Sequence, residues 1–447
     1  MNKRALKYAV LITVCLHVSI LGQSDGTFVV KHKLPDFRDI SLWKGRLGLA
    51  RFSQDGKFAA INGNASEIIV YNTETGEMQS RLMGPSIGGF SFSPEGEYAV
   101  VHHSRDLSHS IFDLEDGSVV KKVKGVGNFV RLLILLSGGI VHQSGGISPP
   151  TNPEMESVYL NADWKSILAD NASETPNRNH GESETRQSQS LNSRFLLIGP
   201  SSHSVISNFE KFMLSAYPNL KKVSLWNLGT GALEREIAVK KKIVACRFSW
   251  DDRYLAISDD EGITRVFRTE GMELVTSIGS KKSKGIVIGW NKAGTKVLIQ
   301  AKDGKGSISG YDSTSGKLLF DFPDSSSGET SIGNTSTLLL AKPKNDNSVL
   351  FHLWETDTGK LLASVPRRTG EKSASFIKWN PDDSLIAVTE DIKTRISIWN
   401  IKGERFQTLD NSSMPMQFSN DGRYLVTGGT SSHDPKVDMG YIWELVP

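Results

Sequence analysis

Short apolar segments separated by polar turns recur along the chain, and the pattern is easiest to follow between residues 375 and 409. Residues 385–388 are apolar at successive positions, which predicts a strand buried on both faces. The turn before it, residues 380–384, consists of Asn, Pro, Asp, Asp and Ser, which favour tight turns. The stretch therefore predicts a four-stranded antiparallel meander, with strands at residues 376–379, 385–388, 395–399 and 404–409.

The third strand of this unit recurs as an apolar segment that ends in an aromatic residue before a polar turn, in most copies one with glycine. The eight aromatic residues are Tyr71, Phe112, Trp226, Phe267, Tyr311, Trp354, Trp399 and Trp443. Six of the seven intervals between them are 41 to 45 residues, and the interval from Phe112 to Trp226 is 114. A period of this length with four strands per copy is typical of a β-propeller blade.

The hairpin before each third strand also repeats, as an aromatic residue followed by a polar turn. Its copies are Phe52-Ser53-Gln54-Asp55-Gly56, Phe92-Ser93-Pro94-Glu95-Gly96, Phe248-Ser249-Trp250-Asp251-Asp252, Trp290-Asn291-Lys292-Ala293-Gly294, Trp379-Asn380-Pro381-Asp382-Asp383 and Phe418-Ser419-Asn420-Asp421-Gly422. Together with the Trp-Asn or Tyr-Asp ending of the third strand, this pattern resembles the WD-repeat propeller family over nearly all of the chain. At the end of the third strand the Trp-Asp dipeptide itself is absent, and the Gly-His opening of the family's repeats is missing. The resemblance implies a propeller that binds other proteins.

The eight copies predict one all-β domain, a β-propeller of eight four-stranded blades, with nine or seven blades as alternatives. The last copy has only three strands before Pro447, while residues 26–33 match the pattern of the fourth strands. We therefore expect the N-terminal strand to pair with the C-terminal blade and close the ring, which would also cover two open sheet edges.

The interval of 114 residues belongs to the third blade. Residues 129–135 and 139–142 fit its first two strands, and a polar stretch follows. One interpretation is a polar insertion at about 145–193 that interrupts the third blade. The alternative is a ninth, degenerate blade around residues 158–160, with residues 195–198 as the second strand of its neighbour.

The N-terminal residues predict a targeting signal, because Lys3, Arg4 and Lys7 precede an apolar run over residues 8–21. The run of about 14 residues is shorter than the roughly 20 that a membrane span needs. We therefore expect a signal peptide at residues 1–24 and an exported propeller over residues 25–447, in the periplasm or outside the cell.

Loss of this segment would remove three positive charges and bring the formal net charge of +3 close to zero. Nucleic-acid-binding proteins usually present a basic domain, so we expect no nucleic-acid partner. Of the two cysteines, Cys15 lies in the expected signal and Cys246 in an apolar strand, which leaves the mature chain without an internal disulfide. We expect a monomer without a membrane span.

Three motifs of the sequence resemble sites of chemistry. Residues 84–88 have the letters of a nucleophile elbow, but that motif needs a strand-to-helix turn, and here it lies in a loop between blades. The paired acids at 251–252, 259–260 and 382–383 coincide with hairpin turns, so we interpret them as turn formers.

The third motif is a histidine group. His102, His103 and His109 flank a hairpin with Asp106 nearby, but adjacent histidines on a strand point to opposite faces. We therefore expect no catalytic, cofactor-binding or metal-binding residues and no cofactor.

These observations predict a non-enzymatic, exported scaffold that docks a protein or another anionic macromolecule. The alternative is a propeller enzyme, a hydrolase or oxidoreductase, with its site at the central channel. In a four-stranded meander, the connection between strands two and three and the connection between blades emerge on one face, and the other two turns on the opposite face. The opposite face carries acids at Asp55, Glu74, Glu95, Glu115, Asp116, Asp251, Asp252, Asp382, Asp383 and Asp421. The inter-blade connections carry bases, and the candidate partner-binding residues are Lys240, Lys241, Lys242, Lys281, Lys282, Lys284, Arg367 and Arg368. We expect this basic face to dock an acidic protein surface or a polysaccharide.

Overall fold

A computed structural model describes the part of the chain that forms the sheets and their closest turns. The described residues are 26–34, 50–64, 66–93, 96–103, 105, 108–123, 130–134, 140–144, 157–161, 189–190, 193–198, 203–209, 211–217, 222–227, 233–279, 284–301, 307–323, 325–343, 348–367, 376–391, 395–429 and 440–447. The expected signal peptide at residues 1–24 lies outside them.

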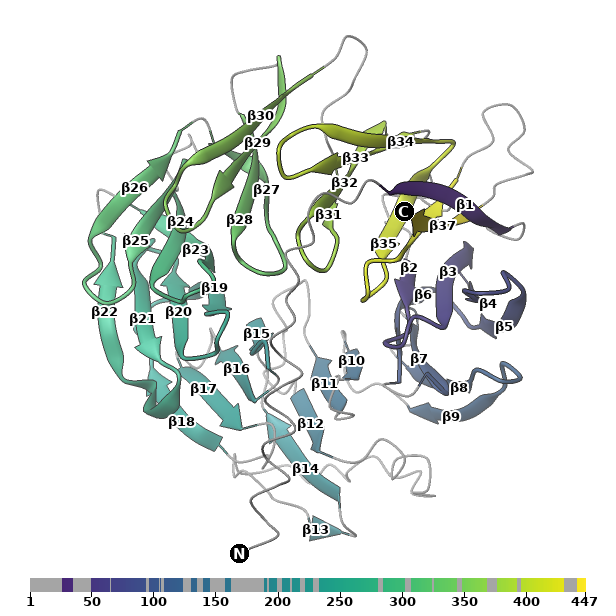
Figure 1. The fold of residues 1–447 in the computed structure, drawn as a ribbon. Coiled ribbons are helices and arrows are strands. Elements are labelled where there is room, and N and C mark those ends of the chain that lie inside the picture. The colour runs from purple at the N-terminus through teal and green to yellow at the C-terminus, as the bar shows by residue number, and fades with distance from the viewer. Residues whose placement is uncertain are drawn as a thin grey trace, which may run out of the picture.

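The described residues form nine antiparallel sheets, which follow one another in chain order around a ring (Figure 1). The first sheet contains β2 (Ala50–Phe52), β3 (Phe58–Asn64), β4 (Glu67–Asn72) and β5 (Met78–Met83). The second contains β6 (Ile87–Phe92), β7 (Tyr98–His103), β8 (His109–Asp113) and β9 (Val119–Val123). The third has five strands, β10 (Val130–Ile134), β11 (Ile140–Ser144), β12 (Ser157–Asn161), β14 (Ser193–Ile198) and β13 (Gln189–Ser190). The fourth contains β15 (His203–Ile206), β16 (Phe212–Tyr217), β17 (Lys222–Asn227) and β18 (Leu233–Ala238).

The remaining sheets repeat the same meander. The fifth contains β19 (Ile243–Phe248), β20 (Tyr254–Asp259), β21 (Thr264–Arg268) and β22 (Leu274–Ile278), with a 3-10 turn, η1 (Glu270–Met272), before β22. The sixth contains β23 (Gly285–Trp290), β24 (Lys296–Ala301), β25 (Ile308–Asp312) and β26 (Leu318–Phe322). The seventh contains β27 (Ser325–Ile332), β28 (Leu338–Pro343), β29 (Val349–Glu355) and β30 (Leu361–Pro366). The eighth contains β31 (Ile377–Trp379), β32 (Leu385–Asp391), β33 (Arg395–Asn400) and β34 (Arg405–Asp410). The last contains β35 (Ser413–Phe418), β36 (Tyr424–Gly428), β37 (Gly440–Val446) and β1 (Thr27–Leu34).

All eight repeats predicted from the sequence are confirmed, because each forms one of the eight four-stranded sheets. The five-stranded third sheet is the ninth blade that the sequence left open, and β12 contains residues 158–160. Two details differ from the sequence interpretation. Residues 195–198 belong to β14, which pairs with β12 as the fourth strand of this sheet, not as a strand of its neighbour. β12 and β13 also lie inside the range 145–193, and β13 pairs with β14 at the outer edge of the sheet.

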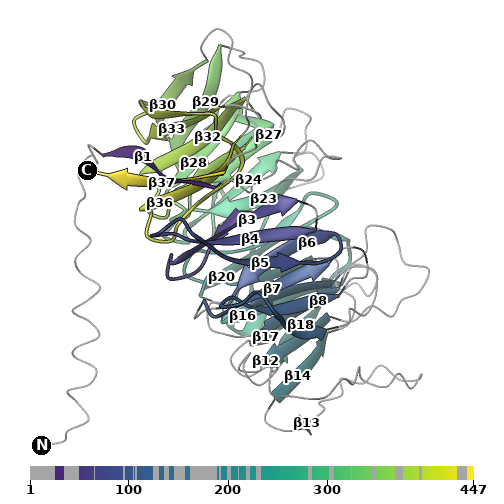
Figure 2. The same ribbon diagram turned by 90° about the vertical axis from the view of Figure 1, so that its right-hand side faces the viewer.

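In each four-stranded sheet the first strand is innermost and the fourth is outermost, and in the third sheet β13 is outermost (Figure 1). The view turned by 90° shows the ring from its side (Figure 2). Apolar side chains of the second and third strands fill the space between neighbouring sheets. Between the first and last sheets, for example, Ile61, Tyr71, Val426 and Ile442 are buried together. The run at residues 385–388 is buried throughout, as its continuous apolar pattern predicts, because neighbouring sheets cover both of its faces. No helix within the described ranges is long and apolar enough to cross a membrane.

The predicted pairing of the N-terminal strand with the last sheet is observed. β1 runs antiparallel to β37, with Thr27 opposite Val446 and Leu34 opposite Gly440. The ring of Phe28 is buried against Phe406 and Phe418, at centroid distances of 6.4 and 6.2 Å. The last sheet thus combines the two ends of the described chain.

Replacing Phe28 with Ala tests how much this strand stabilises the fold. The loss of a buried aromatic ring is expected to lower the free energy of unfolding by about 3–5 kcal/mol, measured by chemical denaturation. Val29→Ala is the matched control, because Val29 is the next residue of β1 and is 41% exposed. Its effect should be within about 1 kcal/mol. Equal effects of the two variants would contradict a packed role for β1.

Candidate functional site

The predicted basic residues lie at three places on the ring. Residues 240–242 connect β18 to β19, and all three lysine side chains are exposed. Lys284 is exposed directly before β23, and Arg367 is half-buried directly after β30. Lys281, Lys282 and Arg368 lie outside the described residues.

Two of these places join into one surface through backbone hydrogen bonds of the β20–β21 turn. The N–H of Asp260 donates to the carbonyl of Lys242 at 2.8 Å. The N–H of Gly285 donates to the carbonyl of Gly262 at 3.1 Å. We call Lys240, Lys241, Lys242 and Lys284 the lysine surface.

A cavity of about 20 Å³, the size of one water molecule, lies within this surface between the fifth and sixth sheets. It is lined by Gly262, Ile278, Gly279, Lys284, Gly285, Ile299, Ala301, Ser309 and Tyr311. Gly262 has a φ of +81°, and a Cβ there would lie 2.5 Å from the Cβ of Lys284. Only glycine therefore allows the β20–β21 turn to approach Lys284 this closely.

The lysine surface also contains acids. The sequence-based division of the ring into one basic and one acidic face is therefore too simple. The ammonium of Lys241 lies 2.6 Å from a carboxylate oxygen of Glu261, and this contact raises the pKa of Lys241. Asp259 is buried and accepts a hydrogen bond from Arg265 at 2.8 Å. Among the described residues no ion pair is seen for Lys240, Lys242 or Lys284. These three lysines are the part of the surface on which a partner can act.

On the opposite face, the acids hold hairpin turns, as the sequence predicts. Asp55 accepts hydrogen bonds from the hydroxyl of Ser53 at 2.7 Å and the N–H of Lys57 at 3.1 Å. The same arrangement is found around Asp251 and Asp421. These carboxylates replace missing backbone bonds in the turn.

Asp252 and Asp383 have a second role that the sequence analysis missed. Asp252 accepts bonds from the N–H groups of Asn208 and Phe209, which belong to the preceding sheet, at 2.7 and 2.8 Å. Asp383 accepts bonds from the N–H groups of Asn334 and Thr335 at 2.6 and 2.8 Å. Burial raises the pKa of Asp383, and the donors from Thr335 and Asn334 oppose this effect. Each carboxylate therefore ties its sheet to the preceding one.

The sequence contains a signal for this role, because four other hairpins have glycine at the same position. These glycines are Gly56, Gly96, Gly294 and Gly422, all with positive φ. Asp252 and Asp383 also have positive φ, of 58° and 63°, which is unfavourable for a residue with a Cβ. An aspartate in a glycine position indicates that its carboxylate makes a compensating contact.

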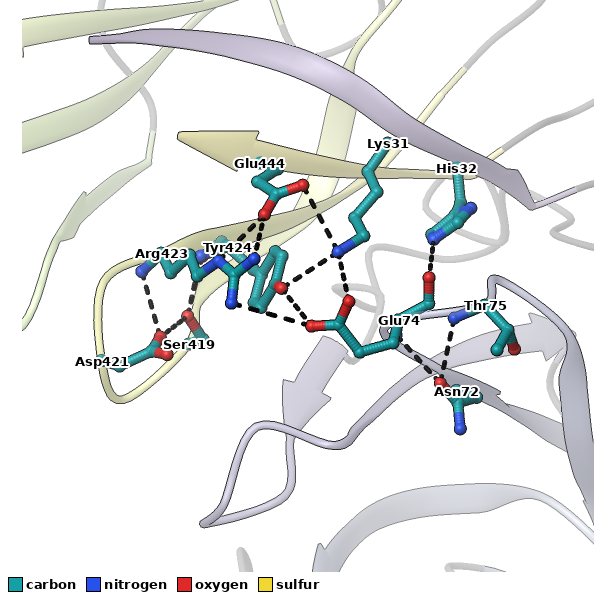
Figure 3. Close-up of polar contacts among 10 residues, drawn as sticks. All are labelled: Lys31, His32, Asn72, Glu74, Thr75, Ser419, Asp421, Arg423, Tyr424 and Glu444. Carbon is teal, nitrogen blue, oxygen red and sulfur yellow. Dashed lines mark hydrogen bonds and ion pairs between the residues drawn. The ribbon is translucent and has the colours of Figure 1, made fainter. Parts of the chain in front are cut away.

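A cluster of charged residues joins β1 to the first and last sheets, and we call Lys31, Glu74, Arg423, Tyr424 and Glu444 the terminal clasp (Figure 3). Lys31 of β1 lies 2.7 Å from Glu74 in the β4–β5 turn and 3.3 Å from Glu444 in β37. The hydroxyl of Tyr424 donates to Glu74 at 2.6 Å, and Arg423 pairs with Glu444 at 2.5 Å. Three segments that are far apart in sequence thus share one charge network.

The clasp shifts the pKa values of its acids downward. Hydrogen bonds from Lys31 and Tyr424 lower the pKa of Glu74 to about 2. Burial raises the pKa of Glu444, but the bonds from Arg423 and Lys31 outweigh burial and lower it. The ammonium of Lys31 also lies 4.8 Å from the centre of the Tyr424 ring. The positive and negative charges of this network alternate and balance one another. The clasp is therefore a stabilising contact and offers no unbalanced charge to a partner.

The remaining sequence motifs have structural roles where they are described. Residues 84–86 form a loop and residues 87–88 begin β6, so a strand and not a helix follows the turn. His103 is buried and its Nε2 lies 2.7 Å from the hydroxyl of Ser110. The described part of the chain holds no group of three His, Cys, Asp or Glu side chains that fits a metal ion. Cys246 is buried, and burial raises the pKa of its thiol to about 12, which makes it unreactive.

The arrangement of four-stranded sheets around an axis defines the chain as a β-propeller, and solved structures agree. No protein-family model matches the sequence, and no curated protein is significantly similar to it. The crystal structure of the eukaryotic initiation factor is similar with a TM-score of 0.55 and 13% identity, covering 84% of this chain and 90% of that one. The C-terminal WD40 domain of Sif2 is similar with a TM-score of 0.50 and 11% identity, covering 94% and 98%. At such low identity the likeness establishes a propeller fold of the WD40 type.

The terminal clasp predicts an acid-sensitive contribution to stability. A carboxylate with a lowered pKa stabilises the fold above its unfolded pKa of about 4.3, and this contribution is lost as the pH falls through the folded value. Glu74→Gln should therefore lower the free energy of unfolding at pH 6 by up to about 1 kcal/mol, since Glu74 is exposed and solvent screens its ion pairs. The difference from the parent should shrink between about pH 4.3 and pH 2, as followed by urea denaturation.

Glu77→Gln is the matched control, because Glu77 is exposed in the same turn and lies outside the clasp. It should behave like the parent at every pH. A Glu74→Gln effect that is constant from pH 6 to pH 2 would show that Glu74 does not stabilise the fold through its charge.

Proposed function

We propose that this protein is a non-enzymatic scaffold that docks an anionic protein surface on the lysine surface. The supporting observation is the convergence of Lys240, Lys242 and Lys284 from two connections that are joined by backbone bonds. Because these loops are held at the ends of packed strands, they present their charges in a fixed arrangement. Loops on a rigid scaffold commonly form binding surfaces.

The chemistry of the surface favours a carboxylate-rich protein. The lysines are flexible point charges, which suit several exposed carboxylates more than one planar group. Glu261 beside Lys241 adds an acid that would repel a uniformly charged polyanion, whereas a protein surface can place a basic residue opposite it. Binding of this kind is strengthened at low salt and mainly affects the rate of association.

The acids and the histidine described above support a scaffold more than an enzyme. Asp55, Asp251, Asp252 and Asp383 each hold a turn or an inter-sheet contact. His103 is buried beside Ser110. Their functional groups are thus used by the fold.

The test is charge reversal of three lysines of the lysine surface, Lys240→Glu, Lys242→Glu and Lys284→Glu together. The immobilised parent should capture an acidic protein from an extract of the source cells, and elution should occur at a few tenths molar salt because the contact is electrostatic. The triple variant should capture it at least tenfold less well, with a melting temperature within about 2 °C of the parent, since surface changes cost little stability.

The matched control reverses three exposed lysines on the opposite face, Lys317, Lys360 and Lys402, with the same change in net charge. This control should capture the partner as the parent does. Equal capture by the parent and the lysine-surface variant would reject the surface. Capture that is lost in both variants would show that net charge alone is responsible.

We also propose that the protein is exported, and the supporting observation is the basic and apolar segment at residues 1–24. N-terminal sequencing of the protein isolated from its source is expected to begin near Gln23 or Asp25. A chain that still begins at Met1 would contradict export by signal cleavage.

A further inference from the structure

One exposed aromatic side chain lies on the face of the ring opposite to the lysine surface. Among the described residues, the exposed large apolar side chains lie on the fourth strands, except Ile401 and Phe209, which lie in turns. Phe209 is the most exposed of them, at 58%. It belongs to the turn between β15 and β16, which connects the first two strands of the fourth sheet (Figure 1).

Phe209 occupies a position where other hairpins carry a turn-forming acid. The serine that begins this hairpin, Ser207, accepts the N–H of Phe212 at 3.1 Å. In three other hairpins the equivalent serine also donates to an acid two residues later, and these acids are Asp55, Asp251 and Asp421. Phe209 has no carboxylate for this contact, so the needs of the turn do not explain its side chain.

A second aromatic residue departs from the repeat in the next hairpin. Trp250 is half-buried in the turn between β19 and β20, where the other described hairpins carry Gln54, Asn208, Lys292, Asn334, Pro381 and Asn420. The Nδ2 of Asn208 donates to the carbonyls of Ser249 and Trp250 at 2.8 and 3.3 Å. The N–H of Phe209 donates to Asp252 at 2.8 Å. These bonds fix the backbones of the two turns, and so the two aromatic residues, next to each other.

The seventh and eighth sheets make the same contact without aromatic residues. The N–H groups of Asn334 and Thr335 donate to Asp383, and the Nδ2 of Asn334 donates to the carbonyl of Asn380 at 2.9 Å. Thr335 stands in the place of Phe209, and its hydroxyl adds a bond to Asp383 at 2.6 Å. Pro381 stands in the place of Trp250. The inter-sheet contact therefore forms without an aromatic pair, and the fold does not require the exposed ring of Phe209.

The exposed charges beside the aromatic residues are basic. Lys211 and Arg253 are exposed in the same two turns, and Lys292 is exposed in the first hairpin of the sixth sheet. The described acids of these turns are used by the fold, because Asp251 accepts bonds from Ser249 and Arg253, and Asp252 holds the preceding sheet. Aromatic and arginine residues are enriched at the centres of protein interfaces, and a basic rim complements carboxylates.

We propose that Phe209 and Trp250 form a docking site for an extended peptide segment of a partner protein, and we call this pair the aromatic site. The segment presents apolar side chains to the two rings and carboxylates to Lys211 and Lys292. A saccharide would instead need several polar side chains for its hydroxyl groups, and the nearest ones, Asn208 and Asp252, are engaged with each other's turns. The aromatic site is separate from the lysine surface and goes beyond the function proposed for it.

The experiment selects peptides from a random library displayed on phage against the immobilised full chain. The expected peptides combine Leu, Ile or aromatic residues with Asp or Glu, and a synthetic copy should bind saturably in fluorescence anisotropy. Phe209→Thr and Trp250→Pro, which copy the seventh and eighth sheets, should each bind this peptide at least tenfold less well, because a few anchor residues contribute most of the affinity. Lys211→Glu with Lys292→Glu should weaken binding in a salt-dependent way.

Matched controls separate the aromatic site from the fold and from the lysine surface. Leu318→Thr, which removes a 47% exposed apolar side chain on β26, should bind the peptide like the parent. The triple variant of Lys240, Lys242 and Lys284 should also bind it like the parent, so a failure of the lysine surface leaves this test intact. Phe209→Thr should melt within about 2 °C of the parent or above it, since its hydroxyl can donate to Asp252 as Thr335 donates to Asp383.

The outcomes that would overturn the proposal are equally specific. Failure to enrich any peptide, equal affinity of the parent and both aromatic variants, or a much lower melting temperature of Phe209→Thr would reject the aromatic site. Enriched peptides without acids would reject the role given to Lys211 and Lys292. Binding of a neutral oligosaccharide such as cellohexaose, lost in the same variants while no peptide is enriched, would reject a protein segment as the occupant.

Discussion

The pairing of β1 with β37 is the contact on which the rest of the fold depends. Each of the other four-stranded sheets is a meander made by one continuous segment of the chain. The last sheet instead combines residues 27–34 with residues 413–446, and its formation needs the two ends of the described chain to meet. Bringing such distant segments together has an entropic cost that grows with loop length, so specific contacts must offset it. The buried ring of Phe28 provides apolar contact, and Gln407 bonds to both the N–H and the carbonyl of Phe28 at 2.7 Å.

The terminal clasp fixes how β1 is positioned against the first and last sheets more than it stabilises the fold. Its residues come from β1, the first sheet and the last sheet, so the charges are satisfied together only when all three segments are in register. Gly76 shows how closely the segments approach, because a Cβ at this residue would lie 2.4 Å from the ring of His32. Exposed ion pairs are individually weak, but a network that requires three partners selects one arrangement over slipped alternatives.

The repeated architecture could be predicted from the sequence because its signals are periodic. Six of the seven intervals between the third-strand aromatics are 41 to 45 residues, and each of those repeats is a sheet in the structure. The third sheet was left open because Leu160, which pairs with Ile140 in the register of the other third-strand aromatics, is not an aromatic residue. The contacts between sheets were missed for a related reason. Asp252 and Asp383 look like ordinary turn residues in one repeat, and only the adjacent sheet reveals their donors.

Some positions of the repeat serve the fold, and others can differ between repeats. The residue before each inner-strand aromatic is Arg51, Ser91, Arg247, Gly289, Lys378 or Gln417, although the residues around it are nearly constant in type. A position whose side chain does not pack in the core can hold a charge at little cost to the core. Arg51 is accordingly exposed beside the buried Ala59 and Ala60 of β3. The lysine surface follows the same rule, because connections between sheets vary in sequence while the strands they join keep buried apolar positions. We therefore expect the functional residues of this propeller at positions where the repeats differ. The sequence identifies those positions only after the repeats have been aligned on the structure.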